Sequence, residues 1–359
     1  MNKTAGLCSL VILLIALPAC DAISAITVPP QEPVVFEPQI YPELDPDSIE
    51  LIGTEPIFMG GGFGAWDESV GGPGAILYYD GLFHMFYSGG QGVGYAISLD
   101  GFDWHRVVDG PILQSSDFSY SFESLRASSA LVTKNGELVM YFSTLGTPEV
   151  GSLETIGRAT ASAPDGPWLP DPQPVLQPGP AGSWDGYRVF SPDIVITSDG
   201  LRMYFGAVDF AGSDRLGETL GEWAIGAAYS PDGLNWEKQN DPETGDDRLD
   251  LSDPVLTLED LTLDNAFVTS PRVWQTPDGW SMLFQQDFNS LSYATSPDGL
   301  NWSSYEGNPI FNAWEELDGV LGIFSPELVY YEGQFFIYFA VFGENIPDAI
   351  YAATARPAE

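Results

Sequence analysis

The feature that most constrains the fold is a segment that returns at a nearly constant spacing along the 359-residue chain. It reads SLDGFDW, SAPDGPW, SPDGLNW and again SPDGLNW. The aspartates of these four copies lie 65, 67 and 66 residues apart, at Asp100, Asp165, Asp232 and Asp298. A fixed period of this kind indicates structural units that bury their apolar faces against one another.

Two further markers raise the number of units to five. A strand, a turn ending in glycine and an aromatic strand recur as ILYYDGLFHMFY, LVTKNGELVMYF, IVITSDGLRMYF, VWQTPDGWSMLF and LVYYEGQFFIYF. Asn-Gly and Asp-Gly pairs between such strands favour hairpins, because both turn positions tolerate positive φ. A strand of small residues precedes each Asp-Gly segment, and a fifth such strand, AIYAATA, lies near the C-terminus.

A short strand with the pattern x-Pro-Ile/Val-Leu/Phe completes each unit. Four copies follow the tryptophans, at Pro111, Pro174, Pro254 and Pro309, and the fifth lies at the front of the chain, as EPIF at 55–58. Proline suits an outermost strand, which leaves one side without hydrogen bonds. The pattern predicts an all-β protein, a five-bladed β-propeller of four-stranded antiparallel blades over residues 52–359, whose ring is closed by an N-terminal strand.

The SPDGxxW segments are interpreted as structural. Asp-Gly favours the turn between the third and fourth strands of a blade, and the tryptophan is expected to pack between blades. The alternative interpretation is that these segments bind a sugar or a metal ion, and we favour the structural one.

The first residues read as a targeting segment. Lys3 is followed by an apolar run from Leu10 to Leu17, too short to span a bilayer comfortably. The ending LPAC resembles a bacterial lipobox, which implies a signal peptide over residues 1–19 and acylation of Cys20. An ordinary cleaved signal peptide is the alternative. Residues 20–51 are rich in proline and acids and are expected to be a tether, so we expect a lipid-anchored protein of the cell envelope, outside the cytoplasm.

Composition limits the partners. The chain has 51 acidic and 12 basic residues, a formal net charge of −39, which repels phosphate backbones and excludes nucleic acid. Both cysteines, Cys8 and Cys20, lie in the first twenty residues, so no disulfide is expected in the body of the protein. His84 and His105 form no zinc pattern and no EF-hand-like spacing appears, so we expect no cofactor and no metal site, although calcium stays open in so acidic a chain.

Charged residues are expected at the centre of the ring, where the innermost strands converge. Three of these strands contain Ser-Pro followed by Asp193, Arg272 or Glu327, and the aligned positions of the first two blades read Gly72-Pro73-Gly74 and Ser128-Ser129-Ala130. Glycoside cleavage needs one protonated and one ionised carboxyl, so Asp193 and Glu327 are candidate catalytic residues, with Arg272 orienting substrate. A structural network that balances buried charges is the alternative.

The rim offers candidate substrate-binding residues. Two acids follow tryptophan directly, in Trp66-Asp67 and Trp184-Asp185, and the tryptophans could stack on sugars. Core packing and loop capping are the alternatives for these pairs. Arg126 and Arg188, just before two innermost strands, could bind an anionic sugar group or balance nearby acids.

The whole repeat resembles that of the five-bladed propeller glycosidases. In order, it consists of a WD pair, an SPxx strand, the hairpin, an MYF strand, an IGxAxSPDGxxW segment and an xPIL strand. These glycosidases include glycoside hydrolase family 43, the levansucrase and invertase families, and the mannoside phosphorylase family 130. The resemblance covers residues 52–359 and implies acids on the innermost strands of blades 1, 3 and 4. Only Asp193 matches, because the first-blade position is Gly72-Pro73 and the fourth is Arg272; Glu327 could substitute.

We therefore expect a carbohydrate-active propeller, glycoside hydrolase-like, that acts on a poly- or oligosaccharide outside the cytoplasm. A catalytically inactive glycan-binding lipoprotein and a structural protein-interaction propeller are the alternatives. The expected partners are carbohydrate and, through Cys20, the membrane. We expect a monomer.

Overall fold

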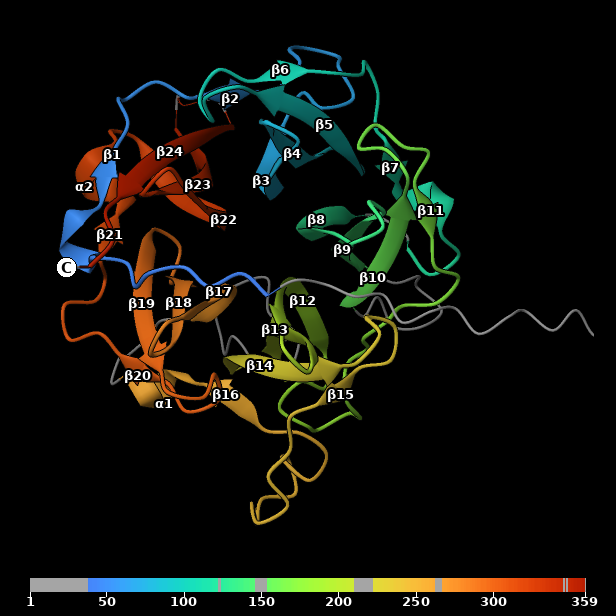
Figure 1. The fold of residues 1–359 in the computed structure, drawn as a ribbon, viewed down its shortest axis with the longest axis vertical. Coiled ribbons are helices and arrows are strands. Elements are labelled where there is room, and N and C mark those ends of the chain that lie inside the picture. The colour runs from blue at the N-terminus through green and yellow to red at the C-terminus, as the bar shows by residue number, and fades with distance from the viewer. Residues whose placement is uncertain are drawn as a thin grey trace, which may run out of the picture. The chain divides into compact units, whose positions relative to one another are not determined.

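The computed structural model describes residues 38–121, 124–145, 154–209, 222–261, 267–344, 346 and 348–358. They belong to one compact unit, Val34–Glu359. Within this unit five antiparallel blades surround a centre, with β3, β8, β12, β17 and β22 innermost (Figure 1). The predicted five-bladed, all-β fold is confirmed. Cys20 and the predicted signal peptide lie outside the described residues.

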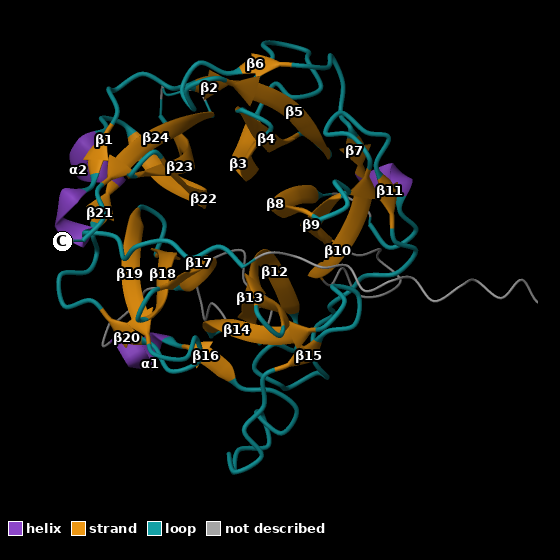
Figure 2. Cartoon of the chain, in the orientation of Figure 1, coloured by secondary structure: helices purple, strands orange, loops and turns teal. Residues whose placement is uncertain are grey.

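Each blade has three long strands and an outer edge of short segments, as the repeat predicts (Figure 2). Blade 1 contains β3 (Val70–Tyr79), β4 (Leu82–Gly89), β5 (Gly92–Ser98), β6 (His105–Arg106) and β7 (Leu113–Gln114). Blade 2 contains β8 (Leu125–Val132), β9 (Leu138–Leu145), β10 (Glu154–Ala161) and β11 (Leu169–Pro170). Blade 3 contains β12 (Arg188–Thr197), β13 (Gly200–Val208), β14 (Trp223–Ser230), β15 (Glu237–Lys238) and β16 (Pro254–Leu256).

The last two blades follow the same plan. Blade 4 contains β17 (Val268–Thr276), β18 (Gly279–Gln286), β19 (Ser290–Ser296), β20 (Ser303–Ser304) and β21 (Phe311–Asn312). Blade 5 contains β22 (Val320–Tyr331), β23 (Gln334–Gly343), β24 (Ala349–Ala355), β1 (Glu50–Leu51) and β2 (Phe58–Met59). The short helices are η1 (Pro46–Ser48), η2 (Ser115–Asp117), α1 (Leu258–Leu261) and α2 (Ala313–Glu316).

The N-terminal strands belong to the last blade. Both β1 and β2 pair antiparallel with β24, with Phe58 opposite Ile350. The chain before β1 also packs on the propeller: Leu44 is buried, and the Trp274 indole donates a hydrogen bond to the Pro42 carbonyl at 2.8 Å. Residues 40–51 are therefore part of the packed unit, whereas the sequence assigned them to the tether.

The core consists of five apolar clusters, one between each pair of neighbouring blades. Strand β23 contributes side chains to two of these clusters. Its odd-numbered side chains, such as Phe335 and Ile337, face blade 4, and Phe336 and Tyr338 face blade 1. Because side chains alternate along a strand, each long middle strand supplies both of its neighbours.

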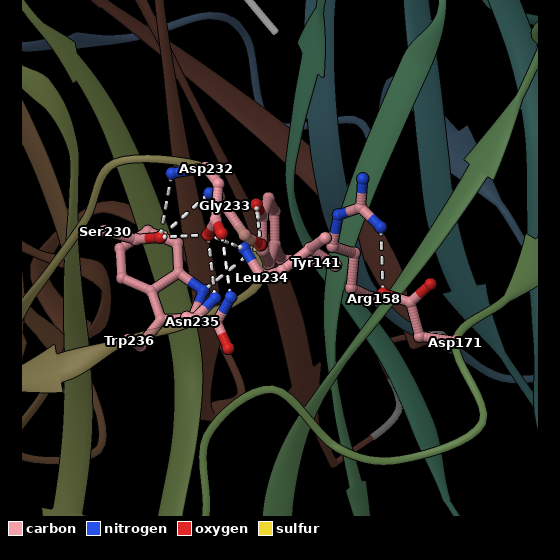
Figure 3. A network of polar contacts seen from close by, with 9 residues as sticks. All are labelled: Tyr141, Arg158, Asp171, Ser230, Asp232, Gly233, Leu234, Asn235 and Trp236. Carbon is pink, nitrogen blue, oxygen red and sulfur yellow. Dashed lines mark hydrogen bonds and ion pairs between the residues drawn. The ribbon is translucent and has the colours of Figure 1, made fainter. Parts of the chain in front are cut away.

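The SPDGxxW segments form turns that join neighbouring blades, as predicted. In blade 3 the Asp232 carboxylate accepts the backbone N–H groups of Leu234 and Asn235, and the Trp236 indole donates to the Gly233 carbonyl (Figure 3). The Tyr141 hydroxyl of blade 2 donates to the same carbonyl at 2.8 Å. The turn therefore receives a hydrogen bond from the blade before it.

Candidate functional site

All five blades contribute residues to a pocket of about 430 Å³, which we call the axial pocket. It lies where the first residues of the inner strands converge. Its polar lining comprises Ser69, Arg126, Ser191, Thr269, Ser270, Gln285, Ser325 and Asp348. A concave site with few polar groups among apolar ones is typical of small-molecule binding.

One side of the axial pocket is an unbroken series of aromatic rings, the aromatic wall. It comprises Phe190 and Trp223 of blade 3, Phe267 and Phe288 of blade 4, and Phe324 and Phe342 of blade 5. Successive ring centroids are 5.4, 5.2, 4.8, 6.5 and 4.7 Å apart. Phe288 and Phe324 are 49% and 37% exposed, so the wall presents open apolar surface to the pocket.

Serine reaches the pocket through a distortion of the inner strands. Ser191, Ser270 and Ser325 have φ values of 49, 51 and 51°, which non-glycine residues rarely adopt. The strand register shifts at each of them, as in a β-bulge. Strained residues of this kind persist where the surrounding fold holds them, and they often mark functional sites.

The predicted catalytic residues lie one position beyond each Ser-Pro pair. The Arg272 Nε atom is 3.2 Å from the Glu327 Oε2 atom, and both side chains are buried. The Asp193 carboxylate accepts the backbone N–H of Val273 at 2.7 Å. None of these three charged residues is among the described residues that line the axial pocket.

Strand pairing corrects the alignment of the first two blades. Ala75 and Ser129, and not Gly74 and Ala130, occupy the positions equivalent to Asp193, each opposite an aromatic residue of the second strand. The cause is the hairpin turns: Tyr79 pairs with Leu82, so that Gly81 lies in the turn, whereas Gly200 itself pairs with Thr197. In blade 2 the turn is longer, because Val132 pairs with Leu138. Blades 1 and 2 therefore have an uncharged residue, Ala75 or Ser129, at the position equivalent to Asp193.

The same position links neighbouring blades in three places. Ser129 Oγ accepts the backbone N–H of Ile194 at 3.2 Å, just as Asp193 accepts that of Val273, and Arg272 pairs with Glu327. Each contact joins one blade to the next. These contacts have the form of the structural network that the sequence left as an alternative.

Burial governs the ionisation of the two carboxyls. Desolvation raises the pKa of Asp193, although Arg272 and the hydrogen bond from Val273 act in the opposite direction. Desolvation also raises the pKa of Glu327 to about 8, with Arg272 lowering it and Asp193 raising it. One guanidinium cannot balance two ionised carboxylates, so the cluster retains a proton near neutral pH.

The predicted rim acids are buried in structural ion pairs. Asp67 is 2% exposed and accepts hydrogen bonds from the Tyr87 hydroxyl at 2.9 Å and from Arg106 Nε at 2.8 Å. Asp185 is fully buried and pairs with Lys238. Both acids therefore hold a cation of the outer strand of their own blade, and neither lines the axial pocket.

The two predicted stacking tryptophans differ. Trp184 is 4% exposed, and its indole donates to the Ser252 carbonyl at 2.7 Å, so it offers no open face. Trp66 is half-buried and lines a second hollow of about 760 Å³. This hollow shares Ser69 and Asp348 with the axial pocket, which leaves Trp66 beside the candidate site.

The two predicted arginines lie near one buried acid. Arg126 is exposed and lines the axial pocket. Arg188 Nη1 is 3.9 Å from the Glu154 Oε2 atom. Burial raises the pKa of Glu154, and both arginines oppose this effect.

Sequence reasoning missed Glu154 and the whole aromatic wall. A partial signal was present, because phenylalanine directly precedes Ser-Pro in blades 3 and 5, at Phe190 and Phe324. The connections between the second and third strands of blades 2 and 3 lie mostly outside the described residues. In blade 4 this connection is short, and Phe288 from it and Gln285 from the strand before it line the pocket.

No three His, Cys, Asp or Glu side chains of the described residues gather so as to hold a metal ion. No helix among them is long and apolar enough to cross a membrane.

No protein-family model and no curated protein matches the chain. Solved structures do match. A thermostable family 43 glycoside hydrolase is 16% identical, with a TM-score of 0.60 over 80% of this chain and 89% of that one. The chain has the fold of the five-bladed propeller glycoside hydrolases.

Two further structures extend this likeness. A family 117 glycoside hydrolase of the marine bacterium Zobellia galactanivorans is 15% identical, with a TM-score of 0.60 over 89% of this chain and 91% of that one. A family 43 enzyme from Xanthomonas citri, solved in complex with xylose, is 14% identical, with a TM-score of 0.57 over 84% and 89%. At these identities the likeness concerns the fold.

Proposed function

We propose that this protein binds a saccharide unit of a poly- or oligosaccharide in the axial pocket, outside the cytoplasm. The aromatic wall carries the proposal. Sugar rings present apolar C–H faces that pack on aromatic rings, and their hydroxyls need polar partners nearby. Ser270, Gln285 and Ser325 lie beside the wall and supply such partners. The xylose complex of the Xanthomonas citri enzyme, which has the same fold, supports this choice of ligand.

Binding without cleavage is the first candidate. Hydrolysis of a glycosidic bond requires two carboxyl groups that flank it. Among the described residues that line the axial pocket, Asp348 is the one carboxylate. Asp193 and Glu327 are instead engaged by Val273 and Arg272.

The test is a glycan array followed by calorimetry with the best ligand. The double substitution Phe288→Ala and Phe324→Ala removes the exposed part of the wall, and we expect affinity to fall about tenfold. Trp314→Ala is the matched control, because Trp314 is 59% exposed but does not line the pocket. An unchanged affinity of the double variant for the saccharide would contradict the proposal. A protein that binds no saccharide at all would point to the protein-interaction alternative.

Hydrolysis is the second candidate, and one observation favours it. Glu327, with its pKa raised to about 8, holds a proton at neutral pH, as a general acid must. Asp193 would then act as the ionised carboxylate. Product release from the bound glycan, followed by chromatography, tests this: turnover that Asp193→Asn abolishes while affinity survives would establish cleavage, and no turnover in the parent protein would exclude it.

We also propose that Cys20 carries the lipid that holds the protein at the cell envelope. The lipobox-like LPAC sequence supports this. Two or three acyl chains bind a bilayer far more stably than one. Labelling with a fatty-acid analogue should mark the parent protein and leave Cys20→Ser unlabelled; equal labelling of both would refute the anchor.

A further inference from the structure

Arg126 is unusual among the arginines of this acidic protein. The chain has only 12 basic residues against 51 acids. Every other described arginine makes an ion pair with a carboxylate or a hydrogen bond to a backbone oxygen. Among the described residues no such partner exists for the Arg126 guanidinium, which is exposed at the axial pocket.

Arg188 supplies a second guanidinium near Glu154; it does not itself line the pocket, and it lies over the Tyr187 ring, 4.9 Å from the ring centroid. It lies on β12 two residues before Phe190, and alternation along a strand places both side chains on one face. Phe190 is part of the aromatic wall. The Arg188 side chain is 37% exposed, and its buried Nε atom has no hydrogen-bond partner among the described residues.

Glu154 does not neutralise this pair. It is the one described carboxylate within ion-pair distance of Arg188, and it acts electrostatically on Arg126 as well. Among the described residues, two guanidinium groups therefore share a single acid, which leaves an excess positive charge within this described set. A buried acid beside two cations helps to hold their side chains in place.

Another part of the axial pocket, beside Ser69, carries a negative charge. Asp348 is exposed there and accepts a hydrogen bond from Ser69 Oγ at 2.7 Å. The pocket thus has an arginine at blade 2 and a carboxylate at blade 5. An anionic group on a bound sugar would be attracted to the first and repelled by the second, which fixes one orientation.

We infer that the saccharide held in the axial pocket carries a carboxylate or sulfate group, and that Arg126 and Arg188 bind this group. The inference rests on the proposed saccharide binding and adds the chemical class of the ligand. Guanidinium groups suit both anions, because their planar donors engage two oxygens at once. With the ligand anion bound, the two positive charges of Arg126 and Arg188 would face two negative charges, those of Glu154 and of the ligand.

The experiment compares matched pairs of ligands by calorimetry. Oligogalacturonate is paired with its carboxyl-reduced form, and a sulfated galacto-oligosaccharide with its desulfated form. We expect the parent protein to prefer one acidic member at least tenfold, and the preferred pair tells carboxylate from sulfate. Raising the salt concentration should weaken that binding and leave binding of the neutral member unchanged.

Arg126→Gln is the decisive variant, because its exposed side chain can be changed without disturbing the core. It should lower the preference for the acidic over the neutral member of the preferred pair about tenfold; Arg188→Gln should act in the same direction. Arg356→Gln is the charge-matched control, since Arg356 is 76% exposed and does not line the pocket.

The outcomes separate this inference from the proposed function. Equal binding of acidic and neutral members, or an Arg126→Gln protein that keeps its preference, overturns the anionic ligand while saccharide binding stands. Loss of all saccharide binding in the parent protein overturns both.

Discussion

Asp193 and Glu327 share one cation, Arg272. This excess of carboxyl groups over positive charge determines how the buried cluster binds protons as the pH changes. Burial raises the pKa of Glu327 from an ordinary 4.5 to about 8, and the charge of Asp193 contributes to the increase. Because the pKa is higher in the folded state, the folded protein binds more protons than the unfolded chain between these two values. This group's contribution to stability is therefore complete below about pH 4.5 and is lost as the pH rises through 8.

We expect the free energy of unfolding to fall between pH 5 and pH 9, by on the order of a few kcal/mol from this group. Asp193→Asn removes the charge that raises the pKa of Glu327, and its side-chain oxygen can still accept the N–H of Val273. The variant should show a shallower pH dependence in urea unfolding. A slope identical to that of the parent protein would show that the two carboxyls do not interact.

At the scale of elements, the second strand of a blade is tied to a turn of the next blade. Tyr141 on β9 donates to the Gly233 carbonyl, and Tyr204 on β13 donates to that of Gly299, both at 2.8 Å. Tyr338 on β23 occupies the equivalent place in blade 5, but its buried hydroxyl has no hydrogen-bond partner among the described residues. The tyrosine hydroxyl therefore stabilises the fold in blades 2 and 3, where it has a partner, and costs free energy in blade 5, where it is buried without one in the described part of the chain.

Substitution by phenylalanine distinguishes these roles. Tyr141→Phe and Tyr204→Phe should each lower the free energy of unfolding by about 1 kcal/mol, because a buried carbonyl loses its partner. Tyr338→Phe should leave it unchanged or raise it, because a buried, unpaired hydroxyl is removed. Urea unfolding of the three variants measures this, and an equal loss in all three would contradict the argument.

At the scale of the whole molecule, the ring depends on residues from its first strands. Phe58 of β2 pairs with blade 5 through β24, yet its ring packs against Tyr87 and the guanidinium of Arg106 in blade 1, with centroid distances of 4.8 and 4.3 Å. It therefore connects the last blade to the first.

Phe58→Ala should lower the free energy of unfolding by about 3 to 4 kcal/mol, as expected for a large buried aromatic residue. Met59→Ala, at the neighbouring position of the same strand, is the control because Met59 is 52% exposed. A Phe58 variant no less stable than the Met59 variant would show that this contact does not hold the ring together.

The sequence predicts this architecture well because its signals are local and repeated. Each turn and each alternating strand recurs about every 66 residues, so a copy that is ambiguous alone is supported by four others. The candidate site lacks this redundancy. Trp223 begins a third strand, Phe288 lies in a loop and Phe324 precedes a Ser-Pro pair, so no alignment of repeats brings them together. Hairpin turns that differ between blades 1, 2 and 3 also displaced the predicted register of the central residues.

The sharing of apolar clusters between neighbouring blades has a consequence for how the protein is made. A blade that leaves the ribosome first has one face without a partner until the next blade follows. The wait is longest for β1 and β2, because their partner β24 (Ala349–Ala355) follows every other strand of the propeller. All five blades must be made before these strands can pair, and until then they are exposed to proteases and chaperones.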